Sequence, residues 1–204
     1  MASHLLLVRH GKIPSAHVGR LIGSTDLPLD PVGLAQARAL AARVARWMPC
    51  RCYSSPMTRC RETAAAMLPG QAIQFDDDLR EIDFGQWEDH AFEEVAAQRP
   101  DLIEGWRAFA PTFAFPGGES MADFFTRVRR AADRLVREEA ETVLAVAHGG
   151  VIRTIICHLL GLEPRQYGLF EVGYAAIVVI RLFDGKGVLA GLECPQVTDG
   201  RTYA

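Results

Sequence analysis

The sequence lacks three features: a long apolar run, a disulfide pattern and a strong excess of either charge. A membrane-spanning helix needs about 20 apolar residues, and no run approaches that length. Only four consecutive strongly apolar residues precede Arg9, which is too few for a signal peptide, so we expect a cytoplasmic protein. The net charge of -3 gives no reason to expect nucleic acid or a membrane as a partner.

Cysteine and lysine are both scarce. An odd count of five cysteines argues against a disulfide scaffold. Cys50 and Cys52 are too close for the usual zinc pair, and no second pair exists, so we expect no metal site. Of the 22 basic residues 20 are arginine, which suits a bidentate grip on phosphate or carboxylate.

Length and composition favour one globular domain over residues 1–204. The chain is long enough to bury a substantial core, and 49% apolar with 23% charged residues is ordinary for a globular protein. No repeat, low-complexity tract or linker divides it.

Short apolar segments alternate with helical ones. This alternation predicts a three-layer α/β/α sandwich with a mainly parallel central sheet. Strands are expected at residues 4–9, 50–54, 72–75, 142–147, 175–183 and 188–192.

Capping signals locate the helix starts. Asp30-Pro31 predicts a helix to about Trp47, and Ser55-Pro56 predicts a second one. Ser120 with Asp123 predicts a long third helix to about Ala140, and a fourth is expected over residues 150–160. Residues 10–29 form a loop long enough to be functional, and residues of about 85–118 are expected to form a small helical lid insertion.

Histidine followed by glycine comes directly after two of the predicted strands. Arg9-His10-Gly11 follows residues 5–8, and His148-Gly149 follows residues 143–147. Ligands bind at the carboxyl ends of such strands in open α/β sheets. Arg59, in the first turn of the helix after another strand, is expected at the same edge.

A helix that begins after His148 adds unpaired backbone N–H groups and a partial positive charge. Two arginines, two histidines and a helix N-terminus in one cleft predict a phosphate site that needs no metal.

These segments together resemble the histidine phosphatase superfamily, over nearly the whole chain. The similarity lies in Arg9-His10-Gly11, in the acidic loop around Glu81, and in His148 with the glycines after it. It also includes Ser55-Pro56-Met57-Thr58-Arg59 with Thr63-Ala64, and the Pro-Gly-Gly-Glu-Ser segment at residues 116–120.

The resemblance implies a metal-independent phosphomonoesterase without a cofactor. His10 would attack phosphorus and form a phosphohistidine. Arg9, Arg59 and His148 would hold the phosphoryl oxygens, and a charged His148 would do so best. Glu81 would protonate the leaving group and then accept a proton from water.

The resemblance also implies the substrate contacts and suggests a substrate. Gly11, Ser24, Thr25 and Gly149 would lie against it. The run over residues 19–29 is similar to the α-ribazole phosphatases of cobalamin synthesis, so α-ribazole 5′-phosphate is one candidate. The true substrate, a small phosphorylated metabolite, and the oligomeric state stay open, with a homodimer as one alternative.

Two other functions are considered. One is a cofactor-dependent phosphoglycerate mutase, which is less favoured because the insertion is short and Gly150 stands where mutases often have asparagine. Ala16 also replaces an asparagine that many family members have, and His17 or water would substitute for it. The other is a phospho-ligand binding module, which would not need the acid Glu81.

Several further residues are interpreted as structural. Asp83 and Glu88 are alternatives to Glu81 as the acid, but only Glu81 fits the motif position. Arg153 is interpreted as a surface or ion-pairing group. We expect histidines with a structural role, whose ring nitrogens are hydrogen-bonded, at His4, His17, His90 and His158. We expect aromatic residues that pack in the core or the lid at Trp87, Trp106, Phe109, Phe113 and Phe115.

Overall fold

The computed structural model describes residues 2–110, 112–184 and 186–194. Within these residues one sheet has six strands in the order β3-β2-β4-β1-β5-β6. Strands β1 to β4 run parallel, whereas β5 and β6 are antiparallel to their neighbours. The strands are β1 (His4–Arg9), β2 (Arg51–Ser54), β3 (Gln74–Phe75), β4 (Thr142–Ala147), β5 (Ile177–Phe183) and β6 (Lys186–Glu193).

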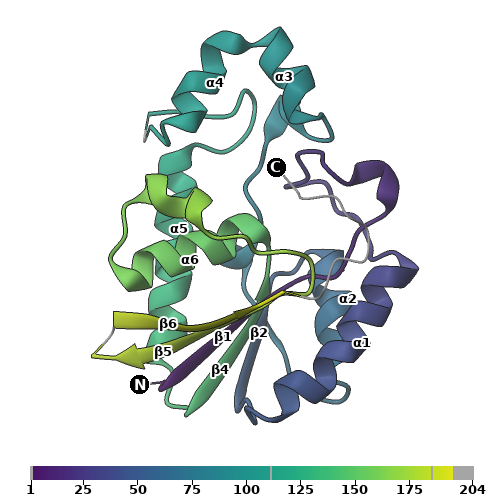
Figure 1. Cartoon of the computed structure of the whole chain (residues 1–204), viewed down its shortest axis with the longest axis vertical. Coiled ribbons are helices and arrows are strands. Elements are labelled where there is room, and N and C mark those ends of the chain that lie inside the picture. Colours follow the sequence, from purple (N-terminus) through teal and green to yellow (C-terminus); the bar gives the residue numbers. More distant parts are fainter. Residues whose placement is uncertain (1, 111, 185, 195–204) are drawn as a thin grey trace.

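Helices cover both faces of this sheet, which confirms the predicted α/β sandwich (Figure 1). Helices α1 and α2 lie on one side, and α5 and α6 lie on the other. The α-helices are α1 (Pro31–Ala45), α2 (Thr58–Met67), α3 (Phe92–Gln98), α4 (Pro100–Arg107), α5 (Met121–Arg137) and α6 (Gly149–Leu160). Short 3-10 helices are η1 (Ser15–His17), η2 (Asp77–Leu79), η3 (Gly85–Trp87) and η4 (Pro164–Leu169).

The central strands bury both of their faces. In β1, Leu5 and Leu7 join the core cluster under α5 and α6, while Leu6 and Val8 join the cluster under α1 and α2. Successive side chains of a strand point to opposite faces, so a strand covered on both sides needs an unbroken apolar run. This requirement explains why the apolar segments at residues 5–8 and 143–147 do not alternate with polar residues.

Two of the predicted helix caps are confirmed. The Asp30 carboxylate accepts the Gly33 N–H at 2.6 Å, and Ser120 Oγ accepts the Asp123 N–H at 3.0 Å. The Ser55-Pro56 start is wrong, because α2 begins at Thr58 after Met57. The Ser55 hydroxyl lies instead at the sheet edge, 2.9 Å from His148 Nε2.

Residues 85–118, the predicted lid, contain η3, α3 and α4. Helices α3 and α4 stand beyond the sheet at one end of the molecule (Figure 1). Trp87, Phe113 and Phe115 are buried there, and edge-to-face ring contacts join Phe115 to both of the others. Aromatic rings in such contacts pack well, so these residues have the packing role expected from the sequence. Pro111, within the predicted lid, lies outside the described residues.

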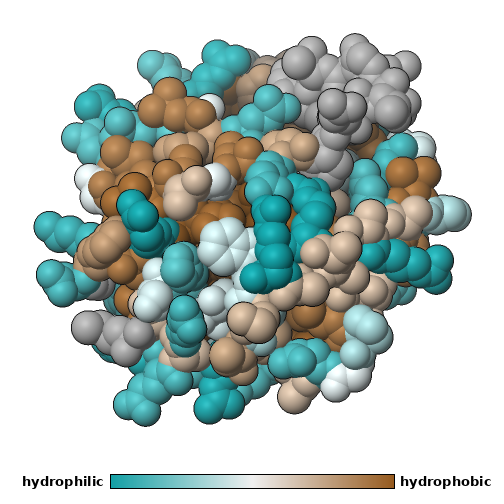
Figure 2. Space-filling model, turned by 60° about the horizontal axis from the view of Figure 1, so that its bottom comes forward, coloured by the Kyte–Doolittle hydropathy of each residue, from teal (hydrophilic) through white to brown (hydrophobic). Residues whose placement is uncertain are grey.

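The surface mixes apolar and hydrophilic side chains. Figure 2 shows apolar residues set among hydrophilic ones over one face of the molecule. Large apolar side chains are exposed at Phe183, Val188 and Leu192 on β5 and β6. No helix in the described part of the chain has the length and apolarity that crossing a bilayer requires.

Candidate active site

The register of β1 and β4 brings His10 and His148 together. Arg9 pairs with Ala147 in the parallel ladder, and the His10 N–H continues it by donating to the Ala147 carbonyl at 3.0 Å. The residue that follows the last paired residue of each strand is a histidine. Neighbouring strands lie about 4.8 Å apart, and the two imidazole centroids are 5.2 Å apart.

One nitrogen of His10 is held and the other is available. Nδ1 lies 2.8 Å from the Gly11 carbonyl, which only accepts hydrogen bonds, so Nδ1 carries the proton. Nε2 is then left with its lone pair. Gly11 fixes this turn, since its N–H donates to Thr63 Oγ1 at 3.0 Å. A Cβ on Gly11 would lie 2.4 Å from the Gly33 carbonyl oxygen, so no larger residue fits there.

Arg59 is buried and supports His148. Its Nε donates to His148 Nδ1 at 3.1 Å, so the neutral His148 ring carries its proton on Nε2. Two further N–H groups of Arg59 donate to the carbonyls of Gly23 and Thr25, each at 2.8 Å. Arg59 thus joins the long first loop to the second histidine, and two of its five donors remain for a ligand.

The surroundings favour the neutral form of both histidines. Burial lowers the pKa of His10 well below its usual value, and the charges of Arg59 and Arg9 lower it further. Burial lowers the pKa of His148 in the same way, followed by Arg59 and His10. The expectation of a charged His148 therefore does not hold without a bound anion, because two fixed guanidinium groups already lie beside it.

Glu81 lies against the N-terminus of α6. Its carboxylate accepts the Gly150 N–H at 2.9 Å and the Ile82 N–H at 3.1 Å. The backbone around it is held by Arg127, whose guanidinium donates to the Arg80 and Glu81 carbonyls at 2.6 and 3.0 Å. Gly150 lies two residues after His148, so its hydrogen bond with Glu81 holds the carboxylate beside the two histidines.

Glu88, one of the alternatives to Glu81, holds the first loop instead. Its carboxylate accepts the N–H groups of Gly23, Ser24 and Thr25 at 2.8–3.2 Å, and the Thr25 hydroxyl at 2.6 Å. Asp83 accepts the Ser24 hydroxyl at 2.9 Å. Ser24 and Thr25 were predicted to contact substrate, but their hydroxyls donate hydrogen bonds to the carboxylates of Asp83 and Glu88.

Arg9 and Gly149 face each other beside the histidines. A Cβ on Gly149 would lie 3.4 Å from Arg9 Cζ, which leaves the first turn of α6 close to the guanidinium. Arg9 Nη1 donates to the Val172 carbonyl at 2.6 Å, and Arg9 Cζ lies 4.3 Å from the Tyr174 ring centroid. Its Nε is buried without a hydrogen-bond partner among the described residues.

Arg153, interpreted from the sequence as a surface or ion-pairing group, is partly exposed and forms no ion pair within the described residues. Its side chain is half-buried, its Nε donates to the Phe170 carbonyl at 2.8 Å, and its Cζ lies 5.2 Å from the Tyr167 ring centroid. The one available signal was its spacing of four residues from Gly149, which places both on one face of α6. Nothing in the sequence indicated Tyr167 or Tyr174, because segment 161–176 returns to the site only in the folded chain.

Several other side chains that could take part in chemistry have structural partners instead. Burial raises the pKa of the Cys60 thiol to about 12, so it stays a neutral group 3.4 Å from His148 Nε2. His17 and His158 lie 2.8 and 2.9 Å from the carboxylates of Asp89 and Asp133, as structural histidines do. No group of three or more His, Cys, Asp or Glu in the described ranges is placed to hold a metal ion.

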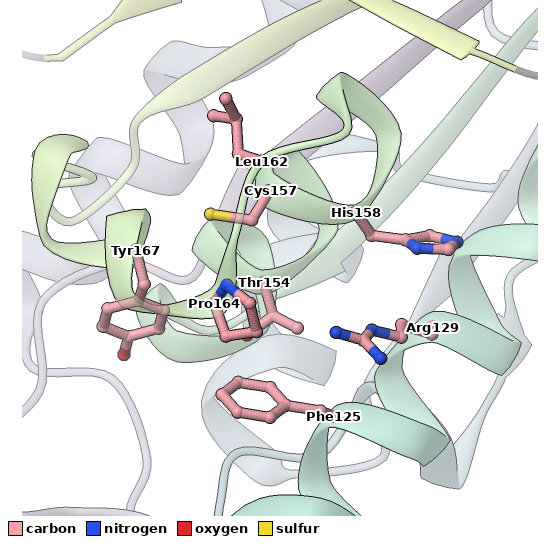
Figure 3. A pocket seen from close by; sticks show the side chains of 8 residues that line it. All are labelled: Phe125, Arg129, Thr154, Cys157, His158, Leu162, Pro164 and Tyr167. Atoms are coloured by element: carbon pink, nitrogen blue, oxygen red, sulfur yellow. The ribbon is translucent and has the colours of Figure 1, made fainter. Parts of the chain in front are cut away.

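A small cavity of about 10 Å³ lies between α5, α6 and η4 (Figure 3). None of the predicted site residues lines it. A cavity of this size has room for one water molecule at most. Its walls are Phe125, Arg129, Thr154, Cys157, His158, Leu162, Pro164 and Tyr167.

Comparisons with known proteins agree with this geometry. A family profile described as "Histidine phosphatase superfamily (branch 1)" matches residues 5–195. Phosphoserine phosphatase 1 of Hydrogenobacter thermophilus is 31% identical over 192 residues, which are 93% of this chain and 91% of the relative.

Two solved structures are similar over almost their whole length. The α-ribazole phosphatase of Shigella flexneri has a TM-score of 0.83 and 25% identity, with 93% of this chain and 95% of that one covered. The phosphoserine phosphatase of Entamoeba histolytica, solved with 3-phosphoglyceric acid, has a TM-score of 0.77 and 27% identity, with 95% and 98% covered. This chain belongs to the histidine phosphatase superfamily, and it is a phosphoric monoester hydrolase.

Proposed function

We propose that this phosphatase hydrolyses a small phosphorylated metabolite through a phosphohistidine at His10, without a metal or cofactor. The observation that carries the proposal is the state of the His10 ring. Its Nδ1 is tied to the Gly11 carbonyl, and its neutral Nε2 lies beside His148 and two guanidinium groups. Such an arrangement combines a nucleophile with fixed positive charge for a phosphoryl group.

The first step transfers the phosphoryl group to the enzyme. Nε2 of His10 forms a bond to phosphorus while the ester P–O bond breaks in line with it. The leaving alkoxide takes a proton from Glu81, which lies at the start of α6. Arg9, the remaining donors of Arg59, and His148 stabilise the negative charge on the phosphoryl oxygens.

The second step returns the enzyme to its starting state. Water attacks phosphorus and gives its proton to the Glu81 carboxylate, while the N–P bond to His10 breaks. The products are the alcohol and inorganic phosphate, and the His10 ring keeps its Nδ1 proton on the Gly11 carbonyl throughout. Splitting hydrolysis into two displacements lowers a barrier that is among the highest known for uncatalysed reactions.

Hydrolysis of p-nitrophenyl phosphate tests the proposal. We expect turnover by the unmodified protein, with kcat lowered by at least about 1000-fold in His10→Ala and by about 100-fold or more in Glu81→Gln. His158→Ala is the matched control, because this histidine is paired with Asp133 outside the site. Two results would contradict the proposal: full activity in His10→Ala, or no turnover by the unmodified protein.

Two rival functions predict other results. A mutase would transfer the phosphoryl group of 2,3-bisphosphoglycerate to a monophosphoglycerate faster than water removes it. A binding module would hold phosphorylated ligands without releasing phosphate. Assays for phosphate release and for transfer, run on the same preparation, separate the three functions. α-Ribazole 5′-phosphate is one candidate substrate, on the basis of residues 19–29 and the similarity to the Shigella flexneri phosphatase.

A further inference from the structure

A strained turn over residues 173–176 comes directly before β5. The Ala176 N–H donates to the Gly173 carbonyl at 3.1 Å, and Ala175 has a φ of +54°. Turns usually have glycine at such a position, because a side chain costs energy in the left-handed region. Ala175 is fully buried in the cluster under α1 and α2, so tertiary packing keeps the turn in this conformation.

The turn is hydrogen-bonded to the backbone of Arg9 and His10. The Arg9 N–H donates to the Ala176 carbonyl at 3.0 Å, and the Ala175 N–H donates to the His10 carbonyl at 3.1 Å. These bonds continue the antiparallel pairing of β1 with β5 beyond its last paired residues. The turn therefore has a fixed position relative to the proposed nucleophile.

The half-buried Tyr174 is the residue of this turn whose ring lies against both Arg9 and His10. Its ring centroid is 4.3 Å from Arg9 Cζ and 5.5 Å from the centroid of the His10 ring. His10 does not depend on this contact for its orientation, because its Nδ1 is already hydrogen-bonded to the Gly11 carbonyl. The effect of the tyrosine ring on the site is therefore expected to act through Arg9.

The Tyr174 ring adds a constraint on the Arg9 guanidinium that its hydrogen bond to the backbone does not supply. Nη1 donates to the Val172 carbonyl at 2.6 Å, whereas Nε is buried without a hydrogen-bond partner among the described residues. A single hydrogen bond leaves the guanidinium plane free to turn about it, and an aromatic ring packed on the plane restricts that motion. Val172 and Tyr174 thus hold the group by two different contacts from one short segment.

The orientation of Arg9 is important because its guanidinium is proposed to hold the phosphoryl oxygens. Donors that already point at the developing charge stabilise the transition state without reorganisation. We propose that Tyr174 is a positioning residue, whose ring holds the Arg9 guanidinium in the orientation in which it meets the phosphoryl group. This inference rests on the proposed mechanism and adds a residue to it. Because the interaction is strongest in the transition state, loss of the ring lowers kcat and leaves KM nearly unchanged.

Removal of the ring tests the proposal. Tyr174→Leu keeps an apolar side chain and should lower kcat for p-nitrophenyl phosphate by about 10-fold, with KM changed less than about twofold. Tyr174→Phe keeps the ring and should retain kcat within about twofold. Unchanged kcat in Tyr174→Leu, or the same loss in Tyr174→Phe, would overturn the proposal.

Tyr53→Leu is the matched control. Tyr53 is also half-buried, but its hydroxyl donates to Glu138, the residue that follows α5. We expect this variant to leave kcat and KM for p-nitrophenyl phosphate unchanged, so a general effect of losing a half-buried tyrosine is separated from the effect at Arg9.

A double-mutant cycle shows whether the ring acts through Arg9. Arg9→Met keeps the apolar stem and removes the charge. In that background Tyr174→Leu should lower kcat further by less than about twofold, because no guanidinium is left to orient. The same loss of about 10-fold in both backgrounds would mean that Tyr174 supports the fold or contacts the substrate itself, and would overturn the proposal. Should Tyr174→Leu not fold, Tyr174→Met takes its place in every measurement.

Binding of orthovanadate separates this inference from the mechanism beneath it. Orthovanadate resembles the phosphoryl group in transfer, and calorimetry measures its Kd without turnover. We expect the Kd to rise about 10-fold in Tyr174→Leu, and less than about twofold when Arg9→Met is already present.

The combined outcomes identify which claim fails. If no ester is hydrolysed but the Kd follows this pattern, the proposed mechanism fails and the positioning of Arg9 by Tyr174 stands. If esters are hydrolysed and neither kcat nor Kd responds to Tyr174→Leu, the mechanism stands and the inference fails. No binding of orthovanadate together with no hydrolysis would overturn both.

Discussion

Glu81 and Gly150 meet at the first turn of α6, where the Gly150 N–H donates to the Glu81 carboxylate at 2.9 Å. A Cβ at position 150 would lie 2.4 Å from Glu81 Oε1 and 3.0 Å from its Cδ. Glycine is therefore required there by the carboxylate and not by the backbone, since the φ of Gly150 is not in the left-handed region. The carboxylate of Glu81, the proposed acid, and the first turn of α6 thus fit each other only with glycine at position 150.

Gly150→Ala should therefore reduce catalysis without unfolding the protein. The new methyl group must move the Glu81 carboxylate by about 1 Å, and a displacement of that size costs on the order of 100-fold in rate. We expect kcat to fall to that extent. The free energy of unfolding should change by less than about 1 kcal/mol, because alanine is also the better helix former.

A matched control is Gly191→Ala in β6, where the nearest atom to a new Cβ is 3.8 Å away. It should leave kcat unchanged. Unchanged kcat in Gly150→Ala would show that Glu81 does not need its place beside α6.

Glu88 should be important for stability although it is no candidate for the proton donor. Its carboxylate accepts hydrogen bonds from Gly23, Ser24 and Thr25 in the first loop, and Arg59 donates to two carbonyls of the same loop. Glu88→Ala leaves several backbone N–H groups without an acceptor, so the free energy of unfolding should fall by about 2–4 kcal/mol.

Glu139→Ala, at an exposed glutamate, is the control for Glu88→Ala and should stay within about 0.5 kcal/mol of the unmodified protein. Urea unfolding monitored by circular dichroism measures both. A loss of less than 1 kcal/mol in Glu88→Ala would mean that water replaces the carboxylate at little cost.

Much of the site could be predicted because it depends on neighbouring strands. His10 and His148 each follow a buried parallel strand directly, so sheet register alone brings their rings together. Glu81 was indicated only by its place in a motif, and the structure puts it at α6. The start of α2 was predicted wrongly, because the Ser55 hydroxyl faces His148 and does not cap the helix.

Other features depend on tertiary contacts that no local pattern records. Tyr167 and Tyr174 reach the site because segment 161–176 passes back over α6 toward β5, and this path is not set by periodicity. Arg153 was interpreted as a surface or ion-pairing group, because a single arginine one turn into a helix carries no signal for a backbone partner. Its actual partner, the Phe170 carbonyl, lies 17 residues further along the chain.

The two site histidines should make stability depend on pH. Their folded-state pKa values are lowered below 6.5, mainly by burial, so the unfolded chain binds more protons in acid. Their full contribution to stability is present above the unfolded pKa of about 6.5 and is lost as the pH falls toward the folded pKa. Each accounts for up to about 1.4 kcal/mol of loss between pH 7.5 and 5.5.

Urea unfolding at these two pH values tests this. The unmodified protein should lose more stability on acidification than His10→Asn, and His10→Asn more than the double variant His10→Asn/His148→Asn. The same loss in all three proteins would contradict the neutral, buried state of both rings.

Thr154 offers a test of the small cavity in Figure 3. Its hydroxyl is buried and has no hydrogen-bond partner among the residues described. The adjoining space of about 10 Å³ is at the lower limit for one water, so we expect it to be dry. Thr154→Val should then raise the free energy of unfolding by about 1–2 kcal/mol, because it removes an unsatisfied polar group.

Thr154→Ser, which keeps the hydroxyl and loses a methyl group, is the companion variant and should lower the free energy of unfolding by about 1 kcal/mol. A loss of stability in Thr154→Val would instead indicate that a water molecule occupies the cavity and bonds the hydroxyl.

The stereochemical course at phosphorus tests the central claim most directly. The substrate is an ester whose phosphoryl group is made chiral with oxygen isotopes, and the phosphoryl group is transferred by the enzyme to an alcohol acceptor in place of water. Two in-line displacements through His10 predict retention of configuration. Inversion would mean that the acceptor attacks the ester directly, and the phosphohistidine mechanism would be wrong.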